Sequence, residues 1–549
     1  MLWYTQSEYA GGIPVFLLEI TWCNRVYRFA NFAVILSSAD GDVEFTDGLK
    51  DFDFKETADL YSVDIEANIV SCAVEFQPHD NILKEFGNGN VLEGSEAVFS
   101  YVIYKNDTVQ NSYDDKIVLM RGQVQEPQYG DPDESDEFVA MSIEPKGINT
   151  TKTLIQNTIN LEDFPTVYWD IDSATAKGKA IPIVIGVPGA TTDPDGTTEQ
   201  LYSAPAYCIK RYASGTADFI ISLGSIDATQ VVIQDENYRT KTVSVVEGST
   251  SRGELFSYIA VPDTISMPGY LTVDQDSRSW YVTFSRSTGG GILNPYNTGS
   301  LSGGGDVLRW AIQKTGGRID DGAFANLSPL LNKYEFAGVI NDPSITAFEW
   351  ITNNLLPYLP VSLRAGPNGI QPILNTLNAI TNIQPLQSIR VGDVEEFRQL
   401  SAVEITRATT DLINVFTMEF AKVGYSGTYA NNVRCTNIAT NNNDIPSDYA
   451  VISQSRYGLQ EKIESSDYIY SRDTAEKIAL EQVRANALPT KTLDISAPIH
   501  YGFFQIGDIL EVTVDRLFLI DIKMMVIEKE YVGAYWRFKL AFEDNPVIQ

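Results

Sequence analysis

Few residues in this chain have the type and spacing that chemistry at an active site requires. The two histidines, His79 and His500, stand alone outside an HExxH pattern, and a lone histidine is typical of a surface or packing position. The serines of Gly299–Gly303 stand one place away from a G-x-S-x-G nucleophile elbow. The glycine triplets do not open a helix after a strand with Walker A or Rossmann spacing. We therefore assign no catalytic and no cofactor-binding residue.

Two acidic stretches resemble the beginning of a calcium-binding loop. Alternate carboxylates in Asp131–Asp133 and Asp193–Gly196 could supply the oxygen ligands that Ca²⁺ prefers. The glutamate expected at the twelfth position is missing, because Ser142 and Ala204 stand there. We interpret both stretches as solvated turns and predict no metal site, with a weak calcium site as the alternative.

A pair of carboxylates that cleaves a glycosidic bond is harder to exclude. The chain has 72 Asp and Glu residues, and glycoside hydrolysis depends on the distance between two carboxyl groups, which a sequence does not give. No inserted compact helical domain that would supply such an activity is visible. Polysaccharide hydrolysis therefore stays open as an alternative.

Composition and charge restrict the possible partners. The 549 residues are 44% hydrophobic, 20% charged and 11% aromatic, which is typical of a folded, strand-rich protein of several domains. The net charge of −32 argues against phosphate neutralisation, so we predict no nucleic-acid binding through a basic patch. We expect the acidity to keep a large assembly soluble or to supply one side of a charged contact.

Cysteine usage and hydropathy indicate synthesis and assembly in the cytosol. The four cysteines lie far apart without a CxxC pair, as buried thiols in a reduced compartment do: Cys23, Cys72, Cys208 and Cys435. The start of the chain lacks the basic and apolar regions of a signal peptide. The longest apolar stretch, Ala180–Gly189, is interrupted by proline and glycine and is too short to span a bilayer. We predict no stable membrane insertion.

Residues 1–154 alternate between apolar and polar side chains as short strands do. The expected strands are Val15–Ile20, Arg25–Phe29, Ile69–Phe76, Ala97–Tyr104 and Lys116–Val124. Regular short strands separated by polar turns predict a small barrel or sandwich. We expect the acidic cluster Asp131–Glu137 to be an exposed loop between the last two strands.

Residues 155–300 predict a β-rich middle domain. A short helix or linker at Thr151–Asn160 precedes the buried-strand pattern Gly178–Gly186. The further strands are expected at Ala206–Ile209, Phe219–Leu223, Gln230–Gln234, Lys241–Val246 and Trp280–Phe284. Two glycine triplets, at 289–291 and 303–305, bracket a loop and are interpreted as sources of backbone freedom.

Residues 301–395 change to a helical period and predict an α/β domain. The helices are expected at Asp306–Thr315, Asp320–Leu331 and Ser344–Asn354, followed by a hairpin of Val361–Arg364 and Ile370–Leu374. Asp306 is the expected N-cap of the first helix.

Residues 396–549 predict a C-terminal barrel with one helix. Strands are expected at Ser401–Ile405, Asn414–Val423, Tyr449–Ser453, Asp467–Tyr470, Leu493–Ser496, Ile509–Val514, Phe518–Glu530 and Ala534–Phe542. The helix Asp473–Leu488 would begin with Asp473 as N-cap and Glu476 three residues on, and end before Pro489. Its small residues predict close packing on the barrel. The whole chain is thus predicted to be mainly β with α+β parts and multidomain, with small antiparallel β-barrels at both ends.

Several segments resemble parts of bacteriophage baseplate hub or tail tip hub proteins. The helix, the Gly507–Asp508 turn and the short meander within Ser455–Asp544 are similar to their C-terminal part. The three helices and hairpin of Asp306–Leu374 resemble a second part. Shorter segments look like counterparts in phage and gene-transfer-agent tail hubs: Phe45–Gly48, Asp80–Asn81, Arg121–Val124 and Gly178–Gly186.

The resemblance implies a structural virion protein at the tail tip or baseplate, assembled in the host cytoplasm. Such a hub is a homotrimer whose two barrels per subunit match a six-fold tail tube to a three-fold tip. Its implied partners are the distal tail or tail tube protein, the tape-measure protein and the tip or fibre proteins, and DNA would pass through the lumen during genome delivery. We expect Phe503–Phe504 and Phe518–Ile520 to be exposed in a lone subunit and covered in the ring.

Two other classes of function remain as alternatives. One is a tail-associated hydrolase or depolymerase acting on cell-wall or surface polysaccharide, which needs a carboxylate pair in a cleft. The other is a receptor-binding spike, for which we expect a repetitive β-helix or a carbohydrate-binding module after the meander, where this sequence stops at Gln549.

Overall fold

The computed structural model describes most of the chain. The described residues are 13–58, 65–66, 69–77, 80, 82–104, 112–130, 138–145, 151–160, 163–164, 176, 178–192, 198–212, 216–234, 240–262, 280–366, 368–377, 383–405, 412–424, 426–533 and 535–543. Of these described residues, 49% lie in strands and 18% in helices, and several sheets are present. The predicted fold class, a mainly β multidomain protein, is confirmed.

The N-terminal strands form a curved sheet that nearly closes into a ring. They are β1 (Ile13–Trp22), β2 (Arg25–Ala30), β3 (Val34–Leu36), β4 (Val43–Asp47), β5 (Leu49–Thr57), β7 (Val70–Glu75), β8 (Glu96–Tyr104), β9 (Ile117–Tyr129) and β10 (Phe138–Pro145), with helix α1 (Ile82–Gly87) and the 3₁₀ turn η3 (Tyr113–Asp115) between them. The pairing order is β5-β7-β10-β9-β8-β1-β2-β4. Because β4 pairs with β2 while β5 continues from it and pairs with β7, the ring of strands nearly closes at Gly48. A side chain is excluded there, since a Cβ on Gly48 would lie 2.6 Å from the carbonyl oxygen of Glu75.

The C-terminal strands form a second, smaller ring. They are β23 (Gln387–Arg390), β24 (Arg398–Gln399), β25 (Glu404–Ile405), β30 (Lys491–Ala497), β31 (Ile509–Val514), β32 (Leu519–Val532) and β33 (Tyr535–Phe542), with the turns η9 (Ile499–Phe503) and η10 (Asp515–Leu517). The antiparallel run β31-β32-β33-β30-β24 is extended by β23, which pairs with β31 in parallel. A bridge between Val391 and Phe397 brings the two ends of this run together. The four strands predicted between Leu493 and Phe542 are confirmed as β30, β31, β32 and β33.

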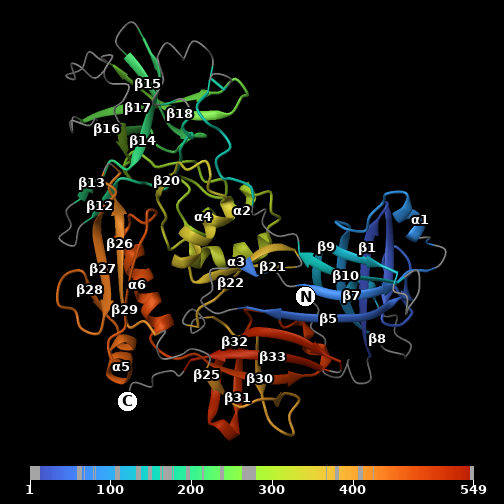
Figure 1. The fold of residues 1–549 in the computed structure, drawn as a ribbon. Helices are drawn as coiled ribbons and strands as arrows, with labels where there is room; N and C mark the ends of the chain where they lie inside the picture. Colours follow the sequence, from blue (N-terminus) through green and yellow to red (C-terminus); the bar gives the residue numbers. More distant parts are fainter. Residues whose placement is uncertain are drawn as a thin grey trace.

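The two rings are fused edge to edge. Residues 55–57 of β5 pair antiparallel with residues 528–530 of β32, so both rings belong to one 16-stranded sheet. Aromatic side chains of both rings share a core: the Phe16 and Tyr531 rings lie 4.5 Å apart, and those of Phe54 and Trp536 lie 5.9 Å apart. Blue and red strands accordingly lie side by side in Figure 1. We call these strands together the barrel pair.

The middle of the chain forms a third barrel, which is closed. Its strands, in the order β14-β15-β18-β17-β16-β19, are β14 (Ala204–Arg211), β15 (Thr216–Leu223), β18 (Leu255–Pro262), β17 (Thr240–Ser249), β16 (Gln230–Gln234) and β19 (Trp280–Thr283). Phe219 and Trp280 pack in its core with ring centroids 4.9 Å apart. The small hairpin of β12 (Ala190–Thr192) and β13 (Thr198–Gln200) lies beside it (Figure 1).

Three helices and a hairpin occupy the centre of the molecule. They are α2 (Gly304–Lys314), α3 (Asp321–Leu331), α4 (Ala347–Asn354), the turn η6 (Leu356–Tyr358), β21 (Val361–Gly366) and β22 (Gly369–Leu374). Strand β6 (Ile65–Glu66) pairs in parallel with β21, and β11 (Ile183–Ile185) pairs with β20 (Gly338–Ile340). The helices and hairpin were predicted, and we call residues 301–377 the central unit.

Two details of the central unit differ from the sequence prediction. The N-cap of α2 is Gly303, whereas Asp306 lies inside the first turn and accepts a hydrogen bond from the Asn294 side-chain amide at 2.8 Å. The glycine triplets allow close packing and are not needed for backbone freedom alone. A Cβ on Gly290 would lie 2.3 Å from the carbonyl oxygen of Gly186, and one on Gly304 would lie 2.8 Å from the Leu359 side chain.

A fourth unit packs a helix on a four-stranded sheet. Its elements are β26 (Val415–Lys422), β27 (Tyr429–Thr436), β28 (Asp444–Pro446), α5 (Asp448–Tyr457), β29 (Glu461–Ser465) and α6 (Arg472–Asn486). The strand predicted at Tyr449–Ser453 is wrong, because this short apolar run lies in helix α5, and such runs suit either structure. Residues 467–470 are also not a strand but a turn and the segment that leads to α6.

Helix α6 was predicted at the right place but with the wrong cap and the wrong partner. Its N-cap is Ser471, whose hydroxyl accepts from the Thr474 backbone N–H, and Asp473 instead forms an ion pair with Lys477 one turn on. The small-residue face containing Ala479 is buried as predicted. It packs on β26 and β27, however, and not on the C-terminal barrel.

Candidate functional site

The residues considered for chemistry do not assemble into a site. His79 and the acidic stretches Asp131–Asp133 and Asp193–Gly196 lie outside the described residues. His500 lies beside Tyr501, and burial lowers the pKa of its imidazole. Among the described residues, no group of three His, Cys, Asp or Glu side chains could hold a metal ion, and no helix is long and apolar enough to cross a membrane.

The cysteines that are buried contribute to packing. Cys72 and Cys435 are buried thiols, and desolvation raises the pKa of each to about 12, so neither carries a reactive thiolate near neutral pH. Cys23 is exposed and Cys208 is half-buried.

A charged cluster lies where the barrel pair meets the central unit. Arg364 of β21 donates to Glu56 of β5 at 2.6 Å, although the two residues are 308 positions apart. Both side chains are buried, with 2% and 3% of their surface exposed. The Nε and Nη1 atoms of Arg364 are buried without a hydrogen-bond partner among the described residues. Such an arrangement is costly, because each unmet donor has lost its water.

Two further ionisable groups face this ion pair. Lys529 is the register partner of Glu56 across the seam between β5 and β32, and its ammonium donates to the Gly502 carbonyl at 2.6 Å and lies 4.8 Å from the Trp536 ring. Burial lowers the pKa of Lys529 to about 8 and raises that of Asp508 to about 6. We call Glu56, Arg364, Asp508 and Lys529 the charge cluster.

One end of the C-terminal barrel is apolar and exposed. Phe518 is 89% exposed and Val394 95% exposed, and Ile520 and Leu400 are also exposed. Two contacts bring the segments that carry them to the same end of the barrel: Arg516 donates to Gln399 at 3.0 Å, and Arg390 lies 3.6 Å from Asp515. We call these four residues the apolar end.

The conformation of Phe518 is unusual for an exposed aromatic residue. Its φ of +55° is left-handed, a region that a bulky side chain rarely adopts. Strain of this kind concentrates at functional positions. Phe518 and Ile520 are exposed, as predicted. Phe504, in contrast, is fully buried in the barrel core, so the prediction for it was wrong.

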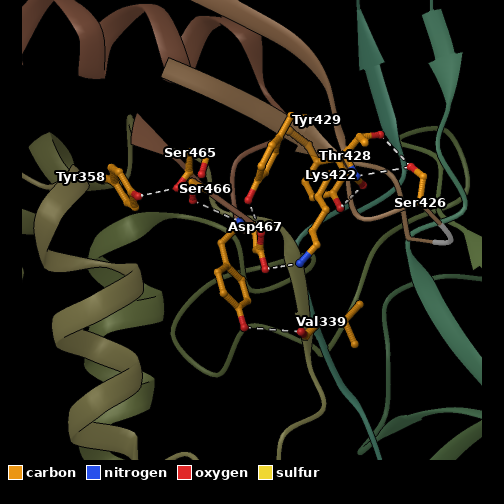
Figure 2. Close-up of polar contacts among 11 residues, drawn as sticks. Val339, Tyr358, Lys422, Ser426, Thr428, Tyr429, Ser465, Ser466 and Asp467 are labelled. Atoms are coloured by element: carbon orange, nitrogen blue, oxygen red, sulfur yellow. Dashed lines mark hydrogen bonds and ion pairs between the residues drawn. The ribbon is translucent and has the colours of Figure 1, made fainter. Parts of the chain in front are cut away.

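A second polar network fixes the segment that leads to α6. Asp467 accepts from the Lys422 ammonium at 2.5 Å and from the Tyr429 hydroxyl at 2.7 Å, and Tyr358 donates to the Ser465 carbonyl at 2.9 Å. Figure 2 shows these side chains converging from the fourth unit and the central unit. The bonds of Asp467 lie within the fourth unit, and the bond from Tyr358 joins the central unit to it. We therefore interpret the network as a brace that holds this segment against the central unit.

A recess of about 330 Å³ lies between η6 and α6. Its walls include Tyr334, Tyr358, Lys462 and Glu481, and burial raises the pKa of the Glu481 carboxyl. A second carboxylate, Glu464, also lines the recess and forms an ion pair with Lys462.

Comparison with known proteins gives structural neighbours of one kind. No family model matches the chain, and no curated protein matches its sequence. The chain is similar to a tail protein from Neisseria meningitidis MC58, with 9% identity, 96% of this chain and 97% of that one covered, and a TM-score of 0.38.

Two larger assemblies also contain similar chains. A chain of a native gene transfer agent virion has 13% identity, coverage of 46% of this chain and 80% of that one, and a TM-score of 0.18. A chain of the phage P2 baseplate in its activated conformation with Ca has 10% identity, coverage of 70% and 98%, and a TM-score of 0.18. The neighbours are thus components of tails, baseplates and gene transfer agents, the class that the sequence resemblance names. Because these TM-scores lie below 0.5, the function proposed below rests on this chain's own sequence and fold.

Proposed function

We propose that this chain is the hub subunit of a phage tail tip or baseplate, or of a phage-like particle, and that it acts as a structural homotrimer within the virion. The hub would close the tail tube until attachment and then open for genome delivery. The sequence resemblance to tail hubs supports this proposal, and the fold adds the physical argument.

The observation that carries the proposal is the fusion of two small barrels into one sheet. The seam between β5 and β32 joins the first and last parts of the chain through backbone hydrogen bonds and a shared aromatic core. Such a pair behaves as one rigid block with two similar lobes. Three copies around a three-fold axis place six lobes in a ring, which is the geometry needed beneath a six-fold tube.

The other units supply what lies outside such a ring. The closed barrel of β14–β19, the central unit and the fourth unit extend from the barrel pair in Figure 1. In the proposed hub they form the cup or plug. The tail tube or distal tail protein, the tape-measure protein and the tip or fibre proteins would bind around them.

The apolar end is the proposed place where a neighbouring protein docks. A strained, exposed Phe518, with the exposed Ile520 two residues on, forms a preformed hydrophobic anchor that a neighbour would cover. The net charge of −32 opposes association at long range. Salt screens this repulsion beyond roughly 8 Å at physiological ionic strength, so short-range burial determines the outcome.

The test is the oligomeric state of the purified full chain and its position in the particle. Native mass spectrometry and light scattering should give a trimer that is more stable at moderate salt than at very low salt. The contact area should exceed the ~1,600 Å² of a standard interface. A chain that stays monomeric both alone and within the particle contradicts the hub proposal.

The two alternatives are tested separately. Incubation with purified peptidoglycan or host polysaccharide should release no product; release that one Asp or Glu substitution abolishes would favour the hydrolase. Specific binding of the lone chain to host surface polysaccharide would favour the spike. Among the described elements no repetitive β-helix favours the spike. The carboxylates to substitute first in the hydrolase test are Glu464 and Glu481, because both line the recess between η6 and α6.

A further inference from the structure

The central unit meets the barrel pair through backbone, apolar and charged contacts. Strand β6 pairs with β21 over two residues. Ile373 of β22 inserts into the barrel-pair core, where it covers Gly507: a Cβ on Gly507 would lie 3.3 Å from that of Ile373. Ile509, Met525 and Ala541 of the C-terminal ring belong to the same hydrophobic cluster as the central unit. The charge cluster adds the ion pair in which Arg364 crosses from β21 to Glu56. The cluster therefore lies at the contact itself.

Every member of the charge cluster comes from a different place in the fold. Glu56 belongs to the N-terminal ring, Lys529 to the C-terminal ring, and Arg364 to the central unit. Asp508 lies in the turn before β31, where its carboxylate accepts from the Gln505 backbone N–H at 2.7 Å. The charged groups that act on Asp508 and on Lys529 are the other members of the cluster. Separation of the central unit would return these charges, and the unpartnered nitrogens of Arg364, to water.

We propose that the charge cluster is a latch whose total charge sets how readily the central unit separates from the barrel pair. With all four groups charged, closing the latch removes the buried Arg364, Glu56 and Lys529 and the partly buried Asp508 from water, and it leaves donor atoms of Arg364 unmet. With Asp508 or Lys529 neutral, closing removes one ion fewer. The latch is thus weakest when fully charged, and it does not depend on the hub proposal.

The pH range in which the latch is weakest follows from the two groups whose pKa is shifted, Asp508 and Lys529. Burial raises the pKa of Asp508 from 3.8 to about 6, so its protonation favours the closed latch as the pH falls from 6 toward 3.8. Burial lowers the pKa of Lys529 from 10.5 to about 8, so its loss of a proton favours the closed latch as the pH rises from 8 toward 10.5. Between pH 6 and 8 both groups are charged, and the closed latch is least favoured.

Hydrogen exchange of the full chain measures this opening directly. Amide exchange of the peptide covering 361–374 is followed by mass spectrometry from pH 5 to pH 9 and corrected for the intrinsic pH dependence of exchange. The opening equilibrium constant should be largest near pH 7 and fall on both sides, by up to about tenfold per pH unit below pH 6 and above pH 8. We call these two falls the acid limb and the alkaline limb of the profile. A peptide covering β15 in the closed middle barrel serves as the internal reference and should show neither limb.

Two variants assign the limbs to their residues. Asp508→Asn should abolish the fall on the acid side and keep the alkaline one, and Lys529→Met should do the reverse. Asp494→Asn is the matched control, because it removes a carboxylate of the same barrel that pairs with Arg537 outside the cluster, and it should keep both limbs.

The wild-type profile decides the proposal even if a variant does not fold. A flat or monotonic profile for residues 361–374 overturns it. So does the same two-sided profile in the β15 reference peptide, because the cluster would then act on global stability and not on this contact. Limbs that persist in both Asp508→Asn and Lys529→Met also overturn it.

Discussion

Removing one partner of the buried Arg364–Glu56 pair should be far more damaging than removing both. Arg364→Met leaves the Glu56 carboxylate, 3% exposed, without its counter-ion in the interior. Breaking a buried ion pair in this way costs about 3–5 kcal/mol, most of it from the stranded charge. The double variant Glu56→Leu/Arg364→Met replaces both ions by apolar groups, which is often neutral or stabilising. The double variant should therefore recover most of the stability that the single variant loses.

The size of the effect is worked against a second ion pair in the same molecule. Arg390 lies 3.6 Å from Asp515, and the two side chains are 59% and 63% exposed, so solvent screening reduces the cost of Arg390→Met to about 0–1 kcal/mol. Urea unfolding followed by circular dichroism compares the midpoints of the four proteins. If Arg364→Met is as mild as Arg390→Met, or if the double variant is no more stable than Arg364→Met, the reasoning about the buried pair is wrong.

Three further predictions concern packing and assembly. Ala479→Leu should overpack the contact of α6 with β26 and β27 and cost about 1–3 kcal/mol, seen as a lower melting temperature. Gly48→Ala should lower stability by a similar ~1–3 kcal/mol, because its Cβ would lie 2.6 Å from the Glu75 carbonyl oxygen. Phe518→Ser/Ile520→Ser should leave the melting temperature of the monomer unchanged or raised and weaken association in light scattering, because both side chains are exposed in the single chain.

Each of these predictions has a matched control. Arg484→Leu places the same side chain at an exposed position of α6 and should change the melting temperature little. Gly41→Ala meets no atom within 4 Å but keeps a left-handed φ of +119°, so it separates backbone strain from the steric clash expected at Gly48. Ile35→Ser removes an equally exposed apolar side chain from the N-terminal ring. If it weakens association as much as the Phe518 variant does, the apolar end is not a specific docking surface.

Local patterns in the sequence predicted most strands of the barrel pair, and the failures have physical causes. Strand β5 was missed because Glu56 occupies a position facing the interior, where an apolar residue normally completes the alternation. The same substitution of charge for an apolar side chain occurs at Lys529, between the buried part of β32 and its end. Charged residues inside otherwise strand-like runs were therefore the signal for the charge cluster. Their partner, Arg364, could not be found from the sequence, because 308 residues separate it from Glu56.

Helix ends and packing partners were harder to predict than the helices. Ser471 and Asp473 are both good N-cap residues. Which of them begins the helix depends on where the preceding turn, held in place by Asp467, ends. The partner of α6 could not be predicted either, since β27, one of the two strands on which it packs, carries polar residues at alternate positions and was not recognised as a strand. The apolar end was predictable in part, because Phe518 ends a turn and directly precedes a strand.

The contrast between the two junctions of the barrel pair shows which part of the molecule can move. The seam between β5 and β32 consists of backbone hydrogen bonds over a continuous aromatic core, and opening it would expose both. The contact with the central unit instead combines a two-residue strand pairing, apolar side chains such as Ile373 and Ile509, and buried charges that water would solvate well. Burial of apolar surface opposes separation at the first junction, whereas desolvation of ions favours it at the second. A conformational change in this protein should therefore leave the barrel pair intact and displace the central unit.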